Sequence, residues 1–303
     1  MLSLNSPNHL PELLAPAGNE ECLYAAVENG ADAVYFGLAK PYNFNARGRA
    51  ENFPLEKLGD TLNFLLRRGV KGYLTLNTLI HFDELSTVEW LLREIAAAHI
   101  DAIIVQDIGV ARLAHRLCPE LPLHTSTQMS LTSAAAIGLA ATLGIRRVVL
   151  PRELSIKQIA ELRRTTNVEL ECFIHGALCI SYSGQCYASL GLGGRSANRG
   201  CCAQPCRLSY SLQKNGTVQT GSERKPILSP HDFAALPLLP KLMTTGVHAL
   251  KIEGRLKPPE YVAQVTKIYR EAIDHFAGIG IGSPTPAGHR GNPPPGRNSA
   301  KKT

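Results

Sequence analysis

Residues 101–128 read DAIIVQDIGVARLAHRLCPELPLHTSTQ and carry the clearest indication of the fold. This stretch begins with a short apolar run, continues with an amphipathic segment at 108–118, and ends in a second apolar run at 121–128. Short apolar runs that alternate with amphipathic helices are typical of a parallel sheet covered by helices. The stretch therefore predicts one strand–helix–strand unit of an α/β protein.

The same alternation extends in both directions along the chain. The predicted strands are residues 12–18, 31–38, 72–80, 101–107, 121–128, 146–153, 168–176 and 247–254. A helical segment follows each of them, and eight such units favour closure into a (β/α)8 TIM-like barrel. A doubly wound open sheet is the alternative architecture.

The barrel is assigned to residues 1–277, with one insertion and one tail. The cysteine-rich insertion follows the seventh strand at about residues 177–225, and it contains a predicted hairpin that turns at Asn215–Gly216. Residues 278–303 are rich in glycine and proline, so we expect this C-terminal tail to be disordered.

Composition and charge limit the classes of function. With 44% hydrophobic and 19% charged residues, and no apolar run near the roughly 20 residues of a membrane span, the chain is typical of soluble globular proteins. The first residues lack the regions of a signal peptide, so we expect a cytoplasmic protein with reduced thiols. The net charge is +7, of which residues 278–303 supply +4, so the charge of the barrel is only weak evidence for an RNA partner.

Polar residues recur where the predicted strands end, and this end of such barrels carries the chemistry. The candidate substrate-binding residues are Asn77, Gln106, Gln128, Arg152 and Arg255, and the candidate catalytic residues are Asp107, Glu153, His175 and Glu253. The two arginines suit the carboxylate or phosphate of a small anionic ligand, and the carboxylates would balance charge or move protons. The alternative is that each arginine only pairs with a carboxylate at the barrel rim.

A second stretch, FIHGALCISYSGQCYASLGLGGRSANRGCCAQPCR at residues 173–207, holds five of the eight cysteines and no acidic residue. Leaving aside Cys201, which adjoins Cys202, the four cysteines are separated by six, fifteen and three residues. This irregular spacing suits zinc or an iron-sulfur cluster, and the absence of paired C-x2-C knuckles favours the cluster. Cys22, Cys118 and Cys172 lie in predicted helices or strands and are expected to be buried apolar residues.

The segment ELECFIHGALCISYSGQCYAS, residues 169–189, resembles the signature of the collagenase-like peptidase family U32. Glu171, Phe173, Gly176, Cys179, Gly184 and Cys186 occupy the positions of that pattern. The resemblance continues in segments such as GRSANRG, QPCRL and LKIEGRLK and covers about residues 11–275. Within the family, the sequence looks most like the branch that hydroxylates a cytidine in 23S ribosomal RNA. Sister branches hydroxylate a tRNA uridine or a ubiquinone precursor.

The resemblance implies a four-iron four-sulfur cluster on Cys179, Cys186, Cys202 and Cys206. It also implies an RNA substrate and prephenate as a co-substrate. Two other functions stay open: a collagenase-like peptidase, as the family name states, and a non-catalytic RNA-binding or assembly module. The sequence contains neither G-x-S-x-G nor H-E-x-x-H, which weakens the peptidase hypothesis.

Overall fold

A computed structural model describes residues 10–219, 221 and 224–278 of the chain. Eight parallel strands form a closed barrel in the order β7–β11–β1–β2–β3–β4–β5–β6, and β6 pairs again with β7. The (β/α)8 prediction is therefore confirmed, and the open sheet is wrong because no edge is left between β6 and β7. The strands are β1 (Glu12–Pro16), β2 (Ala33–Gly37), β3 (Lys71–Leu76), β4 (Ala102–Val105), β5 (Leu123–Thr125), β6 (Ile145–Val149), β7 (Glu169–Gly176) and β11 (Ala249–Ile252).

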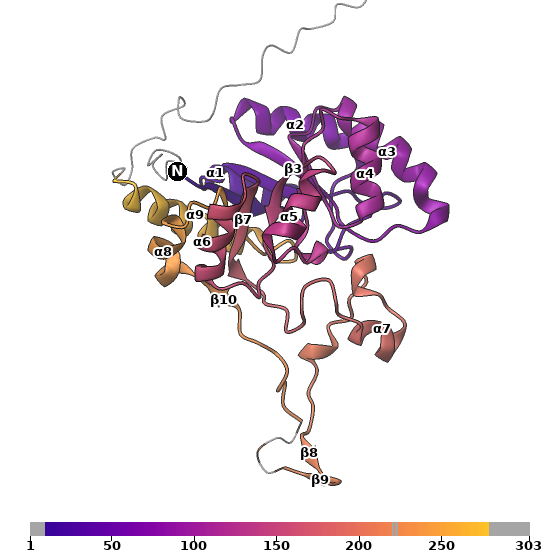
Figure 1. The fold of residues 1–303 in the computed structure, drawn as a ribbon, viewed down its shortest axis with the longest axis vertical. Helices are drawn as coiled ribbons and strands as arrows, with labels where there is room; N and C mark the ends of the chain where they lie inside the picture. The colour runs from indigo at the N-terminus through magenta and orange to yellow at the C-terminus, as the bar shows by residue number, and fades with distance from the viewer. Residues whose placement is uncertain (1–9, 220, 222–223, 279–303) are drawn as a thin grey trace, which may run out of the picture.

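Helices surround the strands on the outer side, as Figure 1 shows. They are α1 (Glu20–Glu28), α2 (Leu58–Arg67), α3 (Leu85–Ala97), α4 (Ile108–Leu117), α5 (Ala134–Ala141), α6 (Ile156–Thr165), α8 (Leu239–Met243) and α9 (Pro259–Phe276). Short 3-10 turns lie at Leu55–Lys57, Phe82–Glu84, Thr127–Met129, Ala197–Arg199, Pro205–Arg207 and Leu236–Leu238. The helix starts follow local chemistry: the side chains of Asn19, Asp107 and Ser155 cap α1, α4 and α6. Within the described residues, no helix is both long and apolar enough to span a membrane.

The main core lies between the strands and the helices. The apolar face of α3 is buried through Val88, Leu91, Leu92 and Ile95, and that of α9 through Val262, Tyr269 and Ile273. Such burial contributes roughly 1.5–3 kcal/mol for each large apolar side chain. Cys22 and Cys172 belong to this core, and Cys118 packs against it half-buried. The helices thus hold the barrel and leave its carboxyl-terminal mouth free for a site.

The interior of the barrel is charged, although the strands read as mostly apolar. Glu12 on β1 binds Lys71 at 2.8 Å and Arg147 at 2.6 Å, and Arg147 also reaches Glu171 at 3.4 Å. Glu171 in turn binds Lys251 at 3.0 Å. These five side chains form a series of ion pairs along the barrel axis, from the amino-terminal end of β3 to a point beneath the mouth.

The insertion begins after Gly176 and runs on to Asp232, further than the predicted end at 225. It contains α7 (Ala188–Gly193) and a hairpin of β8 (Gln213–Lys214) and β9 (Thr217–Val218), which turns at Asn215–Gly216 as predicted. The chain then returns as β10 (Phe233–Ala234), antiparallel to the end of β7, and α8 follows it. In Figure 1 the hairpin projects away from the barrel. The tail was predicted to be disordered, and its residues after Gly278 lie outside the described part of the chain.

Contacts with two strand-end loops fix the insertion over the mouth. Gly184 has a φ of +75° and packs so closely on the loop after β5 that a Cβ would lie 2.1 Å from the Gln128 carbonyl oxygen. Asn198 donates to the Gly184 carbonyl at 3.0 Å and accepts from the Gln128 amide at 3.3 Å. Arg199 forms an ion pair with Glu84, whose pKa is lowered chiefly by that hydrogen bond. The insertion is therefore a roof with a defined position.

Candidate active site at the mouth of the barrel

A cavity of about 700 Å³ lies between the strand ends and the insertion. Its floor is built by residues at or after strand ends. Its roof is built by residues 176–182, 184–188, 202 and 204–207 together with neighbouring parts of the insertion. Five cationic side chains line it, namely Arg47, Arg152, Arg207, Lys251 and Arg255. Glu253 is the one acidic residue among the lining residues. The wall thus carries an excess of positive charge, which favours an anionic ligand.

Arg255 lies on the floor, directly after β11, and is only 4% exposed. Its guanidinium donates from Nη1 to Asn45 Oδ1 at 3.1 Å and to Thr75 Oγ1 at 2.9 Å. The carbon Cζ lies 5.7 Å from the centre of the Tyr35 ring. Burial lowers the pKa of Arg255 to about 10, which leaves it cationic at neutral pH.

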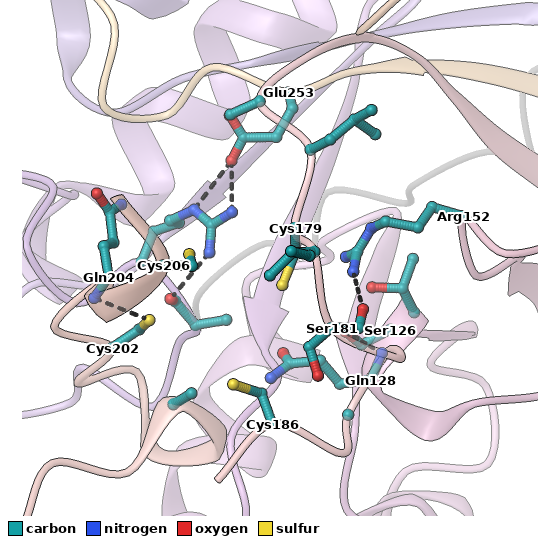
Figure 2. Close-up of a pocket in the computed structure, with 18 of the residues that line it drawn as sticks. Ser126, Gln128, Arg152, Cys179, Ser181, Cys186, Cys202, Gln204, Cys206 and Glu253 are labelled. Carbon is teal, nitrogen blue, oxygen red and sulfur yellow. Dashed lines mark hydrogen bonds and ion pairs between the residues drawn. The ribbon is translucent and has the colours of Figure 1, made fainter. Parts of the chain in front are cut away.

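Glu253 is held by Arg47, whose Nη2 and Nε lie 2.8 and 2.9 Å from Oε1 (Figure 2). This pair explains why the pKa of Arg47 is raised, with Glu253 as the largest cause. Arg47 lies in the loop between β2 and α2, away from any predicted strand end, so it could not be predicted as a site residue from the strand pattern. The carboxylate of Glu253 is therefore already paired with Arg47, although Glu253 lines the cavity as predicted.

Four of the five insertion cysteines line the cavity: Cys179, Cys186, Cys202 and Cys206. Figure 2 shows their sulfur atoms around one common space. Burial raises the pKa of the Cys206 thiol, and the neighbouring Cys179 and Cys202 raise it further, while Arg207 acts in the opposite direction. Cys201 is exposed and is absent from the lining residues, so its neighbour Cys202 alone faces the cavity.

The distances between these thiols bear on the kind of metal group that they could hold. Among the described residues, no three His, Cys, Asp or Glu side chains are close enough to hold one metal ion. A cluster places several iron and sulfide atoms between its ligands, so its thiolates lie farther apart than the ligands of a single zinc ion. The backbone N–H of Gln204 also donates to Cys202 Sγ at 3.3 Å, which holds this sulfur in place at the cavity. Four cysteine thiols around one space are a donor set of the kind that suits an iron-sulfur cluster.

His175, the last but one residue of β7, lines the cavity beside two tyrosines. Its Nδ1 lies 3.3 Å from the Tyr269 hydroxyl, which donates its proton to the Ile174 carbonyl at 2.9 Å. The hydroxyl must therefore accept from His175, which assigns the proton to Nδ1 and leaves Nε2 as an acceptor. Burial lowers the pKa of His175, so the ring is neutral at pH 7 and able to act as a base.

Three sequence-predicted residues have other roles in the structure. Asp107 does not line the cavity: it caps α4 by accepting from Val110 N at 3.1 Å, and it also accepts from Ile80 N at 3.2 Å. Glu153 accepts from Ser183 N at 2.6 Å and so anchors the insertion. Gln106 is buried outside the cavity, and its Oε1 has no hydrogen-bond partner among the described residues. We therefore do not assign catalysis or substrate binding to these three.

The other predicted residues do line the cavity. Arg152 donates to the Ser181 carbonyl at 3.3 Å, which ties it to the roof (Figure 2). Asn77 accepts from Ala46 N at 2.9 Å, and Gln128 contacts Asn198. Lys251 also lines the cavity but is not among the residues predicted from the sequence; its side chain is buried, with Nζ 4.3 Å from the Tyr35 ring centre. The sequence did contain a signal for Lys251, because a lysine inside a predicted apolar strand is seldom buried unless it is paired.

Fold and site together define a (β/α)8-barrel protein whose mouth is covered by a cysteine-rich roof. Residues 18–280 match the family model described as “Peptidase family U32”. The chain belongs to peptidase family U32. Among solved structures, the barrel is similar to “The Structure of the U32 Peptidase Mk0906”, with a TM-score of 0.54 and 10% identity over 84% of this chain and 97% of that one. At this identity the likeness shows the fold alone.

Curated relatives carry two kinds of name. “tRNA hydroxylation protein P1” of Bacillus subtilis is 39% identical over 88% of this chain and 64% of that protein. “23S rRNA 5-hydroxycytidine C2501 synthase” of Escherichia coli is 40% identical over 88% of this chain and 40% of that protein. “Collagenase” of Porphyromonas gingivalis is 37% identical over 88% of this chain and 66% of that protein. The chain thus spans between 40% and 66% of the lengths of these relatives.

Proposed function

We propose that this chain is the barrel part of an RNA-modifying enzyme that hydroxylates a pyrimidine base, with a cytidine of 23S ribosomal RNA as the preferred target and a tRNA uridine as the second. The observation that carries the proposal is the position of four cysteines around one cavity, in a chain that is 39% and 40% identical to RNA hydroxylation proteins. The identities are too similar to separate the two RNA targets.

The chemistry of hydroxylation supports a redox cofactor in this cavity. Replacing a ring C–H bond by C–OH is a two-electron oxidation, and ordinary protein side chains do not perform it alone. We propose that Cys179, Cys186, Cys202 and Cys206 hold a four-iron four-sulfur cluster, which would supply electron transfer when bound. Around it, His175 Nε2 is the acceptor for a proton from the substrate, and the cationic floor binds prephenate, the co-substrate that the family resemblance implies.

The peptidase function is the second candidate, and the collagenase relative favours it. A thiol peptidase needs a cysteine activated by a neighbouring histidine. Among the described residues, however, His175 is hydrogen-bonded to Tyr269 and to no cysteine. A peptidase also has no use for four thiols around one space. The geometry therefore supports the hydroxylase better.

The proposal is tested by iron and sulfide analysis of protein purified without oxygen. We expect a brown protein with iron and sulfide, and loss of both in Cys202→Ala. The matched control is Cys201→Ala, because Cys201 is the adjacent residue but lies outside the cavity. Colourless protein with stoichiometric zinc would reject the cluster.

The RNA function is tested in cells that lack the protein. Nucleosides from 23S ribosomal RNA and from tRNA are analysed by mass spectrometry, with and without the restored gene. We expect one hydroxylated pyrimidine to disappear from one RNA class and to return with the wild-type protein and with Cys201→Ala, but not with Cys202→Ala. Unchanged nucleosides, together with cleavage of gelatin by the purified protein, would favour the peptidase.

A further inference from the structure

We propose that Arg255 is the anchor of a carboxylate-binding subsite on the cavity floor, and that the ligand is a small organic anion rather than the RNA. The inference rests on the proposed function only in taking this anion to be the co-substrate of the hydroxylase. The subsite itself follows from the distribution of charge around Arg255.

The charge of Arg255 is not compensated by the protein. A buried guanidinium is normally paired with a carboxylate, because removing an isolated charge from water is costly. Both groups that accept from Arg255, Asn45 Oδ1 and Thr75 Oγ1, are neutral. No carboxylate of the described residues lies within 4.0 Å of its guanidinium nitrogens. The structure therefore contains a buried cation that lacks its counter-charge.

The nearby carboxylates are already engaged with other cations. Glu253 is bound to Arg47 at 2.8 Å, and Glu171 is bound to Lys251 at 3.0 Å. Arg147 also contacts Glu171, but it is held mainly by Glu12 at 2.6 Å and Glu169 at 2.8 Å. Arg255 is therefore the cation of the floor that has no carboxylate of the described residues within 4.0 Å. Arg152, which the sequence suggested equally, is partly exposed and bound to the roof, so an anion on Arg152 remains accessible to water. Of these two arginines, Arg255 is the one whose guanidinium is shielded from water.

The position favours a small carboxylate over a phosphate of the RNA. An RNA-modifying enzyme that acts on an unpaired base takes the base into its pocket, and the backbone phosphates stay outside. Arg255 lies at the bottom of the cavity, below the roof. Nη1 is committed to Asn45 and Thr75, but the described structure shows no acceptor for Nη2 or Nε. These two nitrogens form one edge of the guanidinium, which matches both oxygens of a carboxylate.

The experiment is calorimetric titration of the anaerobically purified protein with prephenate, malonate and inorganic phosphate, in the absence of RNA. We expect Arg255→Met to weaken binding of prephenate roughly 10- to 100-fold, the loss of a charge-assisted hydrogen-bonded pair. Arg255→Lys keeps the charge without the fork and should be intermediate. The control Arg93→Met removes a surface arginine paired with Glu89, and it should bind as the wild type does.

Thermal unfolding without ligand separates a binding role from a structural one. Because Arg255 is an uncompensated buried charge, Arg255→Met should unfold within a few degrees of the wild type or above it. A large decrease in melting temperature, together with unchanged affinity in Arg255→Lys, would show that the arginine is structural and overturn the proposal. Failure of the wild type to bind either carboxylate would overturn it as well, and tighter binding of phosphate than of prephenate would exclude a carboxylate ligand.

RNA analysis keeps the two proposals distinguishable. If the wild type binds prephenate through Arg255 but no RNA nucleoside depends on the protein, the hydroxylase function is rejected and the subsite stands. If RNA is hydroxylated and Arg255→Met binds prephenate as the wild type does, the subsite alone is rejected.

Discussion

At the scale of single residues, the site depends on backbone contacts as much as on side-chain chemistry. Gly18 at the end of β1 has no side chain because the Arg255 carbonyl oxygen occupies that space: a Cβ on Gly18 would lie 2.0 Å from it. The Arg255 backbone therefore packs closely against the residues after β1. This contact fixes the position from which the Arg255 side chain extends. Gly18 therefore controls the floor of the cavity without touching a ligand.

We predict that Gly18→Ala displaces Arg255 and lowers both stability and anion affinity. Overpacking a close contact typically costs about 1–3 kcal/mol, and the guanidinium would move with its backbone. The control is Gly59→Ala in α2, where a Cβ meets no atom within 4 Å and should stabilise the helix by roughly 0.5–1 kcal/mol. Urea unfolding and prephenate titration measure both effects. Wild-type affinity in Gly18→Ala would show that the floor adapts to the added methyl group.

Single residues also show what could be predicted of the site. The rule that strand ends carry the chemistry placed Arg255, Glu253 and His175 at the cavity correctly. It failed for Asp107, because the same position is also the N-cap of a helix, and a cap was the stronger local requirement. Arg47 could not be found, since only the closed barrel brings its loop to Glu253.

At the scale of elements, the strands are the instructive case. Their number and order followed from the alternation of strands and helices, because each unit repeats one simple pattern. The ion pairs inside the barrel did not follow, although Glu12, Arg147, Glu171 and Lys251 interrupt apolar runs in the sequence. The partners in each ion pair come from strands that are distant in the sequence, and they come within bonding distance only when the barrel closes. β10 was missed because two residues are too few for a periodic pattern.

We predict that the barrel-axis ion pairs make stability depend on acidity through Glu12. Burial alone would raise its pKa, but Arg147 and Lys71 overcome this and lower the pKa to about 2. The ionised carboxylate therefore contributes stability that is fully present above about pH 4.5 and is lost as the pH falls toward 2. Glu12→Gln should cost about 3–5 kcal/mol at pH 7, because it leaves Arg147 partly uncompensated.

The measurement is urea unfolding of wild type and Glu12→Gln at pH 7, 4.5 and 3. The difference between the two proteins should shrink from pH 4.5 to pH 3. The surface variant Glu89→Gln, which breaks a pair with Arg93, should change stability by no more than about 1 kcal/mol. A difference that stays constant with pH would mean that Glu12 stabilises the barrel by packing rather than by charge.

At the scale of the whole molecule, the described chain consists of a packed barrel and an insertion that covers its mouth. The projecting hairpin of Figure 1 has exposed strands, and its stem closes where Tyr210 and Lys225 exchange two backbone hydrogen bonds of 2.8 and 3.0 Å. A pair bonded in this way accepts a two-residue Asn-Gly turn. The barrel and the cavity therefore do not require the hairpin.

We predict that replacing residues 211–224 by Asn-Gly leaves the melting temperature within a few degrees of the wild type. The shortened protein should also keep its iron and its affinity for prephenate, because the cavity-lining residues are untouched. A loss of RNA hydroxylation with these properties intact would indicate that the hairpin contacts the RNA. A large decrease in melting temperature would instead show that the barrel relies on this segment.

The pairing of β10 with β7 has a consequence for how such proteins are built. Phe233 lies opposite Gly176, so the chain leaves the barrel and returns to it at the same point. The two ends of the insertion are therefore held together by main-chain pairing. Lengthening a loop whose ends are fixed in this way costs little conformational entropy. We therefore expect that an insertion of another length can be grafted between Gly176 and Phe233 without altering the register of the barrel strands.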